Sequence, residues 1–88
     1  MECGGIEFKN VELFVKAYNS YVKSKERIGI KQAMEELDVY SKYLSPGASF
    51  TVKLRKEHLD PKVNKLAVFF FNVTTEDGKR IIEYVGHD

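Results

Sequence analysis

In the first half of the chain, hydrophobic residues recur every three or four positions, which is the spacing of an amphipathic helix. One such stripe predicts a helix over residues 11–25, preceded by Asn10, a residue type that caps helix N-termini well. A second stripe predicts a helix over residues 30–43, which begins after Gly29 and ends before the Ser-Pro-Gly sequence at 45–47. The pattern therefore predicts two consecutive helices.

Beyond Pro46 the hydrophobic period falls from about 3.6 residues to about 2, which is typical of strands. Residues 50–55 alternate between apolar side chains and hydroxyl or basic ones, so they predict a strand with a basic outer face. Residues 66–74 and 80–85 predict two further strands, and Asp77–Gly78 between them predicts a type I turn followed by a bulge. The three strands are predicted to form an antiparallel meander.

The N-terminal residues 6–8 fit either a short extra strand or a segment packed on the first helix, and residues 1–5 are expected to be flexible. A chain of 88 residues has room for one hydrophobic core. We therefore predict a single α+β domain over residues 1–88, with two N-terminal helices packed on a three-stranded antiparallel β-meander.

The strand predicted at residues 66–74 is apolar on both faces, whereas a strand with one face in water alternates. Val68 and Phe70 point to the opposite face from their sequence neighbours. Two helices cover only one face of the sheet, so an apolar patch remains on the second face. Depending on the hairpin register, the neighbours of this patch on the last strand are Ile82 and Tyr84, or Ile81 and Val85.

We expect the second face to be an interaction patch made of Val68, Phe70, Ile82 and Tyr84. Exposed apolar patches mark sites of association in soluble proteins. The chain is therefore predicted to be a small non-enzymatic binding module that forms a homodimer or docks on a protein partner. Two alternatives stay open: the loop at 56–65 or the N-terminal segment folds over the patch, or a ligand or nucleic acid stacks on it.

Composition and charge limit the partners, metals and cofactors that the sequence can be expected to bind. The net charge of +1 favours no class of partner by attraction to the whole molecule. The single cysteine, Cys3, excludes an internal disulfide and a cysteine-based zinc site, and His58 has no neighbours at a metal-ligand spacing. We expect no metal, no cofactor and no small-molecule ligand. Because the sequence has neither a membrane-spanning apolar run nor a signal peptide, we expect a cytoplasmic protein without membrane contact.

Basic residues cluster around the first predicted strand of the meander. Lysine and arginine neutralise phosphates, and aromatic rings on a sheet stack on bases. Binding of RNA or DNA without catalysis is therefore an alternative function, with Phe70 and Tyr84 as stacking residues. The candidate phosphate contacts are Lys53, Arg55, Lys56 and Lys65. A solvated strand face explains the same charges without a ligand.

Residues 32–45, QAMEELDVYSKYLS, resemble a DNA-binding helix-turn-helix. In that family a short helix ends in leucine before a tight turn, and here Leu37, Asp38 and Val39 take those positions. The resemblance implies a recognition helix that begins near Tyr40 and enters the major groove. The alternative is one continuous amphipathic helix through the same residues.

The C-terminal sequence TTEDGKRIIEYVGHD, residues 74–88, resembles the last hairpin of the RelE/ParE toxin family. The matching positions are Asp77, Gly78, Lys79, Ile81, Ile82, Val85, Gly86 and His87. The predicted order of elements, with an optional first strand before two helices and three strands, also fits that family. The resemblance implies a ribosome-dependent mRNA endonuclease with a cognate antitoxin as its partner.

In such an enzyme, phosphoryl transfer from an RNA 2′-hydroxyl needs cations for the phosphate and an acid and a base for the two oxygens. The resemblance implies that Arg55 and Lys65 supply positive charge and that Tyr84 or His87 acts as acid or base. Asp88 stands where the family usually has arginine. A RelE-like ribonuclease is therefore the alternative to the binding module.

Overall fold

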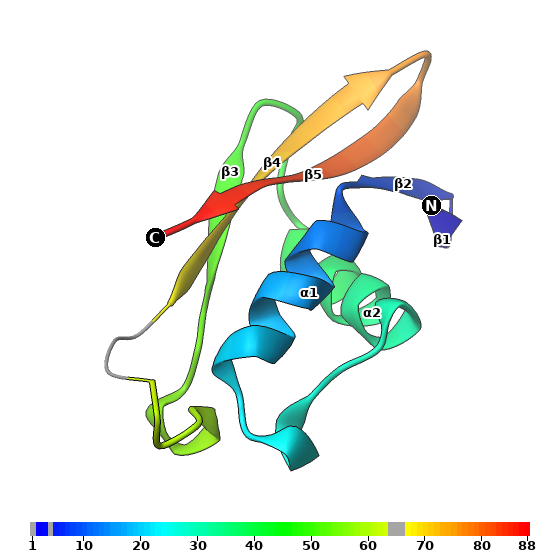
Figure 1. The fold of residues 1–88 in the computed structure, drawn as a ribbon. Coiled ribbons are helices and arrows are strands. Elements are labelled where there is room, and N and C mark those ends of the chain that lie inside the picture. The colour runs from blue at the N-terminus through cyan, green and yellow to red at the C-terminus, as the bar shows by residue number, and fades with distance from the viewer. Residues whose placement is uncertain (1, 4, 64–66) are drawn as a thin grey trace.

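The computed structural model describes residues 2–3, 5–63 and 67–88 (Figure 1). Over these residues the chain is α+β. The two helices are α1 (Val11–Tyr21) and α2 (Ile30–Ser41), and single 3-10 turns lie at η1 (Ser24–Glu26) and η2 (Lys56–His58). The strands are β1 (Glu2–Cys3), β2 (Ile6–Lys9), β3 (Ser49–Lys53), β4 (Val68–Glu76) and β5 (Lys79–His87).

The strands of the described residues form one mixed sheet in the order β1-β2-β5-β4-β3, in which β1 has only two residues. The predicted antiparallel meander β3-β4-β5 is present, but the prediction of three strands was incomplete. β2 lies beside β5 and runs parallel to it, with Phe8 opposite Ile82. Phe8 is buried there as part of the hydrophobic core.

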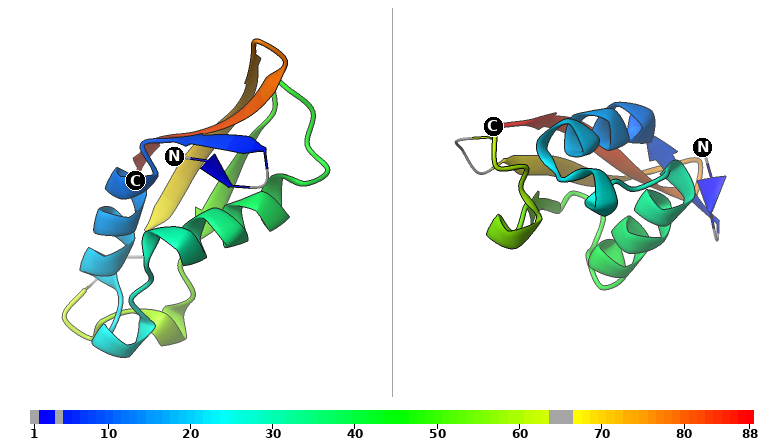
Figure 2. Two further views of the ribbon diagram at one scale, coloured as in Figure 1. Left: turned by 90° about the vertical axis from the view of Figure 1, so that its right-hand side faces the viewer. Right: turned by 60° about the horizontal axis from the view of Figure 1, so that its bottom comes forward.

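Both helices cover the same face of the sheet, here called the inner face (Figure 2). The alternation predicted for β4 is observed, since Phe69, Phe71 and Val73 are all buried on this face. Phe14 of α1 packs edge-on against Phe69 and Phe71, with ring centroids 5.2 and 5.0 Å apart. Leu37 is buried on the core-facing side of α2.

Both helices are shorter than their hydrophobic stripes predicted. α1 ends at Tyr21 because Val22 is extended and forms an isolated β-bridge with Leu59. α2 ends at Ser41, and the Arg80 side chain donates a hydrogen bond to the carbonyl oxygen of Ser41. The helix-turn-helix alternative is wrong, because α2 is one continuous helix.

Two local predictions are corrected at the ends of elements. The side chain of Asn10 does not cap α1; it donates a 3.2 Å hydrogen bond to the carbonyl oxygen of Tyr84 instead. Glu2–Cys3 pair with β2, and the expected flexibility of residues 1–5 stays a prediction. The turn at Asp77–Gly78 has positive φ at both residues and directly joins paired Glu76 and Lys79, as in a two-residue type I′ turn rather than a type I turn with a bulge.

Candidate functional site

The register of the β4–β5 hairpin decides which side chains share the second, outer face. Phe71 lies opposite Tyr84 and Val73 opposite Ile82, so Tyr84 and Ile82 belong to the inner face. Their exposed fractions are only 7% and 1%. The prediction that they join Phe70 in an interaction patch is therefore wrong. The two-residue turn sets this parity, which the hydrophobic pattern left open, because one register holds from Glu76–Lys79 to Phe71–Tyr84.

The outer face nevertheless carries an apolar patch. Phe70 on β4 and Val85 on β5 are 39% and 52% exposed, and Val68 is partly buried beside them. These three residues are called the outer-face patch below. Gly86 lies opposite Phe70, and space for a side chain at Gly86 is open. The surface beside Phe70 is therefore open at Gly86.

The two segments that were alternatives for covering this face lie elsewhere in the described residues. Asp60, in the described part of the predicted loop, donates a 3.0 Å backbone hydrogen bond to Tyr21 at the end of α1. The N-terminal segment extends the sheet at its edge as β1 and β2. Phe70 and Val85 thus remain exposed.

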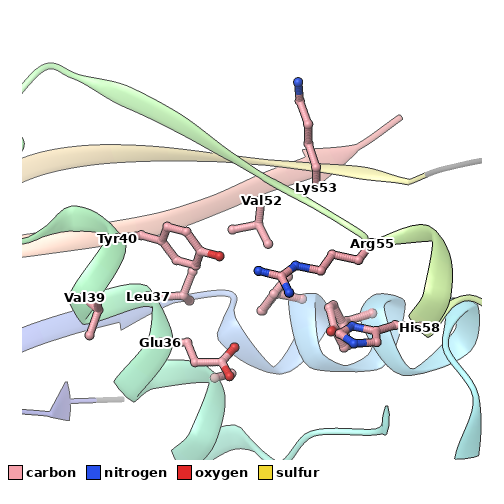
Figure 3. A pocket seen from close by; sticks show the side chains of 11 residues that line it. Glu36, Leu37, Val39, Tyr40, Val52, Lys53, Arg55 and His58 are labelled. Carbon is pink, nitrogen blue, oxygen red and sulfur yellow. The ribbon is translucent and has the colours of Figure 1, made fainter.

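A cleft of about 370 Å³ lies on the inner side of the molecule between α1, α2 and β3, and it is called the β3 cleft below (Figure 3). Its floor is apolar and includes the buried side chains Leu37 and Val52. Glu36 on α2 and Arg55 after β3 reach toward it from opposite sides, and no ion pair joins them (Figure 3). The sequence did not indicate this cleft, because its lining comes from α1, α2, β3 and η2, which are separate in the sequence.

Two titratable groups at the β3 cleft have carboxylate neighbours. Burial raises the pKa of the Tyr18 phenol above its ordinary value, and the charge of Glu36 raises it further. Tyr18 is therefore a neutral hydrogen-bond donor at neutral pH. His58 lies 3.8 Å from Glu26, Nε2 to Oε2, and forms an ion pair with it when the imidazole is protonated. The β3 cleft therefore offers hydrogen-bond donors and acceptors, and it is lined by the negatively charged Glu36 and the positively charged Arg55.

An exposed aromatic cluster lies beside the β3 cleft at the end of α2. Val39 and Tyr43 are largely exposed, and so is Tyr40. The Tyr40 ring stacks on Phe50 of β3 at 6.3 Å, and Phe50 stacks on Phe71 at 5.0 Å. This column of rings connects the surface to the core. The helical spacing of residues 30–43 predicts only that these residues belong to a helix, and it does not indicate an exposed cluster.

The predicted nucleic-acid contacts do not form one stripe. Arg55 reaches into the β3 cleft, whereas Lys53 points away from the side chains around it (Figure 3). Lys56 is exposed on η2, and Lys65 lies outside the described residues. The side chains of Arg55 and Lys53 are therefore directed toward different regions of the surface.

The residues implied by the toxin resemblance separate into two places. Tyr84 and His87 share a 2.8 Å hydrogen bond between the phenol oxygen and Nδ1. Burial raises the pKa of the Tyr84 phenol, with a smaller contribution from Tyr21. Neither Tyr84 nor His87 lines the β3 cleft that Arg55 enters. Lys65, the fourth member, lies outside the described residues.

Within residues 2–3, 5–63 and 67–88, no group of three His, Cys, Asp or Glu side chains is arranged to hold a metal ion. Over the same ranges, no helix has the length and apolar character needed to cross a membrane.

Comparisons of the chain with protein-family models, curated proteins and solved structures found no significant match. The function proposed below rests on the geometry of the outer face and of β3.

Proposed function

We propose that the protein is a small non-enzymatic binding module that contacts a second copy of itself through the outer face of its sheet. The observation that carries this proposal is the exposure of Phe70 and Val85, 39% and 52%, on adjacent strands of that face. Removing large apolar side chains from water lowers the free energy, which favours association with a partner that covers them. A reducing, cytoplasmic location fits the single cysteine, Cys3.

The neighbours of Phe70 support a specific contact rather than a scattered exposed residue. Gly86 on one side carries no side chain, and Thr51 on the other side presents a short hydroxyl side chain. An exposed aromatic ring between two small neighbours is accessible to a partner, and aromatic anchors carry much of the binding energy of interfaces. A two-fold axis through this region places the same patch on both copies, as closed dimers require.

The test is sedimentation equilibrium of the wild type and two variants over a range of concentrations. Phe70→Asp introduces a charge into the outer-face patch and is expected to weaken association at least about tenfold. Asn72→Asp is the matched control, because it places the same charge on the same strand and face, two residues away. The proposal fails if Phe70→Asp associates as the wild type does, and a wild type that is monomeric at all concentrations also contradicts it.

The alternative function is a RelE-like ribonuclease or another nucleic-acid-binding protein. Two observations favour keeping it: the order β2-α1-α2-β3-β4-β5 fits the order of elements that the resemblance implies, and Tyr84 is hydrogen-bonded to His87. A nuclease of this kind should arrest growth when it is expressed, and Arg55→Ala or His87→Ala should restore growth. Normal growth on expression of soluble wild type argues against the nuclease.

A further inference from the structure

β3 lies at the end of the sheet, and its pairing with β4 determines where its backbone groups point. Leu54 donates a 3.2 Å backbone hydrogen bond to Ala67, and Val73 donates one of 2.9 Å to Ala48. In an antiparallel pair, hydrogen-bonded positions alternate with positions whose backbone groups point away. Because positions 48 and 54 face β4, the even-numbered residues between them do so as well. The N–H and C=O groups of Ser49, Thr51 and Lys53 therefore point toward the open side.

This open side is called the β3 edge below. Among the described residues, β4 is the only strand that pairs with β3. The side chains of Ser49, Thr51 and Lys53 are exposed as well. A strand with unpaired N–H and C=O groups along one side is a template for another strand. The β3 edge can therefore accept an extended segment by backbone hydrogen bonding.

We propose that two copies of the chain pair antiparallel through their β3 edges, about a two-fold axis at Thr51. This inference rests on the proposed function, self-association, and adds to it a second and separate contact. The register places Thr51 opposite the partner's Thr51 and Ser49 opposite the partner's Lys53. All outward-directed backbone groups of Ser49–Lys53 then have partners, because the segment is symmetric about its middle residue.

The side chains fit this register and disfavour the one centred on Lys53. Two threonines at the axis form a favourable cross-strand pair, with hydroxyl groups able to bond each other. Each Lys53 faces a serine rather than a second lysine. A register centred on Lys53 would instead set two like charges opposite each other, which is unfavourable. The register at Thr51 therefore pairs all three outward-directed residues of β3 with those of a second copy and keeps the two Lys53 side chains apart.

The same register brings a side chain of the second copy toward the β3 cleft. Phe50 and Val52 point to the inner side, and in the pair Val52 lies opposite the partner's Phe50. Because Val52 lines the β3 cleft, that ring comes to lie next to its apolar floor. It approaches the exposed Tyr40, which already stacks on Phe50 of its own chain. A second copy therefore adds an apolar ring beside the cleft.

On the outer side, edge pairing joins the two sheets into one surface. Phe70 lies beside Thr51 in the β4–β3 register, so the two Phe70 residues flank the two threonines at the axis. Neighbouring strands are about 4.8 Å apart, which places the two Phe70 residues about 14 Å from each other across three strand intervals. The edge pair thus presents two outer-face patches side by side on one continuous sheet.

The experiment combines variants at the two contacts and measures mass by sedimentation equilibrium. Thr51→Pro removes an N–H that points to the β3 edge, and proline is tolerated at such edge positions. Thr51→Val is the control, because it keeps the N–H and favours strands. In the Phe70→Asp background, Thr51 and Thr51→Val are expected to give dimers and Thr51→Pro to give monomers. Hydrogen exchange at the amide of Lys53, whose N–H points to the same edge, should be slow in the dimers and fast in the monomer.

The outcomes separate the two proposals. If the Phe70→Asp protein is already a monomer, or remains a dimer after Thr51→Pro, the β3 edge does not pair and the inference is overturned. If wild type and Phe70→Asp have the same mass, the outer-face contact is absent, although the edge contact stands. Circular dichroism establishes that each variant is folded. Ser49→Pro, at the first residue of β3, replaces Thr51→Pro if that variant does not fold.

Discussion

At the scale of single residues, Tyr84 shows how a side chain predicted at the surface serves the core. Its ring contacts Phe14 and Phe71, with centroids 5.7 and 5.4 Å away. Its phenol oxygen is hydrogen-bonded to His87, which lies at the end of β5. An aromatic body inside and a polar tip with a partner is the usual arrangement for a buried tyrosine. Tyr84 therefore stabilises the fold rather than offering a contact.

The raised pKa of Tyr84 predicts a pH-dependent contribution to stability. Burial favours the neutral phenol in the folded state, so the unfolded chain loses this proton first as the pH rises past its ordinary pKa of 10.0. The free energy of unfolding should therefore fall above about pH 10. Below about pH 9 both states keep the proton, and Tyr84 adds no pH dependence there.

Urea unfolding of Tyr84→Phe from pH 7 to 11 measures this contribution. The variant should lose about 1 kcal/mol at neutral pH with the hydrogen bond to His87, and should show a shallower alkaline decline than the wild type. Tyr43→Phe is a control at an exposed ring and should keep wild-type stability at neutral pH. An unchanged alkaline decline in Tyr84→Phe would show that this phenol does not titrate differently on folding.

At the scale of elements, Arg80 of β5 connects the end of α2 to the sheet by hydrogen bonds. The last carbonyl groups of a helix have no partners within the helix. The Arg80 guanidinium donates hydrogen bonds to the carbonyl oxygens of Ser41 and Leu44, and a longer one of 3.5 Å to that of Lys42. A positive charge at a helix C-terminus is also favoured by the helix dipole.

Arg80→Ala should therefore lower the free energy of unfolding by about 1–3 kcal/mol, because partly buried carbonyl groups lose their donors. Lys16→Ala removes an exposed cation from the middle of α1 and should leave stability nearly unchanged. Urea denaturation of both variants measures the difference. Equal stabilities would mean that the Arg80 hydrogen bonds contribute nothing beyond what water supplies.

The sequence pattern predicted the elements that local periodicity determines. The two-residue period of β4 correctly placed Phe69 and Phe71 inside and Phe70 outside. The pattern did not predict the parallel pairing of β2 with β5, because residues 6–9 contact a strand more than seventy positions away. Helix ends were also missed, since Val22 continues the helical spacing but pairs with Leu59.

Only part of the candidate site was predictable, because local periodicity places single residues on a face but does not show which residues of other strands lie beside them. Phe70 follows from the alternation along one strand, whereas its neighbours depend on the hairpin register, where one residue of shift exchanges the two faces. Ile82 and Tyr84 were therefore assigned to the wrong face. The β3 cleft joins α1, α2 and β3, so no short stretch of sequence carries its pattern.

At the scale of the whole molecule, the described residues form an elongated body with extents of 43 × 21 × 19 Å. The helices cover the inner face, and the outer-face patch and the β3 edge remain accessible. These two surfaces share Thr51 and Phe70 as direct neighbours in the sheet. If two copies pair through their β3 edges, their outer-face patches therefore lie next to each other. The pair then presents two outer-face patches to further copies, which allows a larger assembly.

The most direct test of self-association through the outer face is a dilution series of ¹⁵N-labelled protein followed by NMR. The expected result is that amide signals of Phe70, Val85 and Gly86 move with protein concentration while those on the exposed side of α1 stay fixed. Signals that do not move at any concentration would contradict the proposed function. Shifts that appear only when RNA is added, and that gather at Arg55, Tyr84 and His87, would favour the ribonuclease instead.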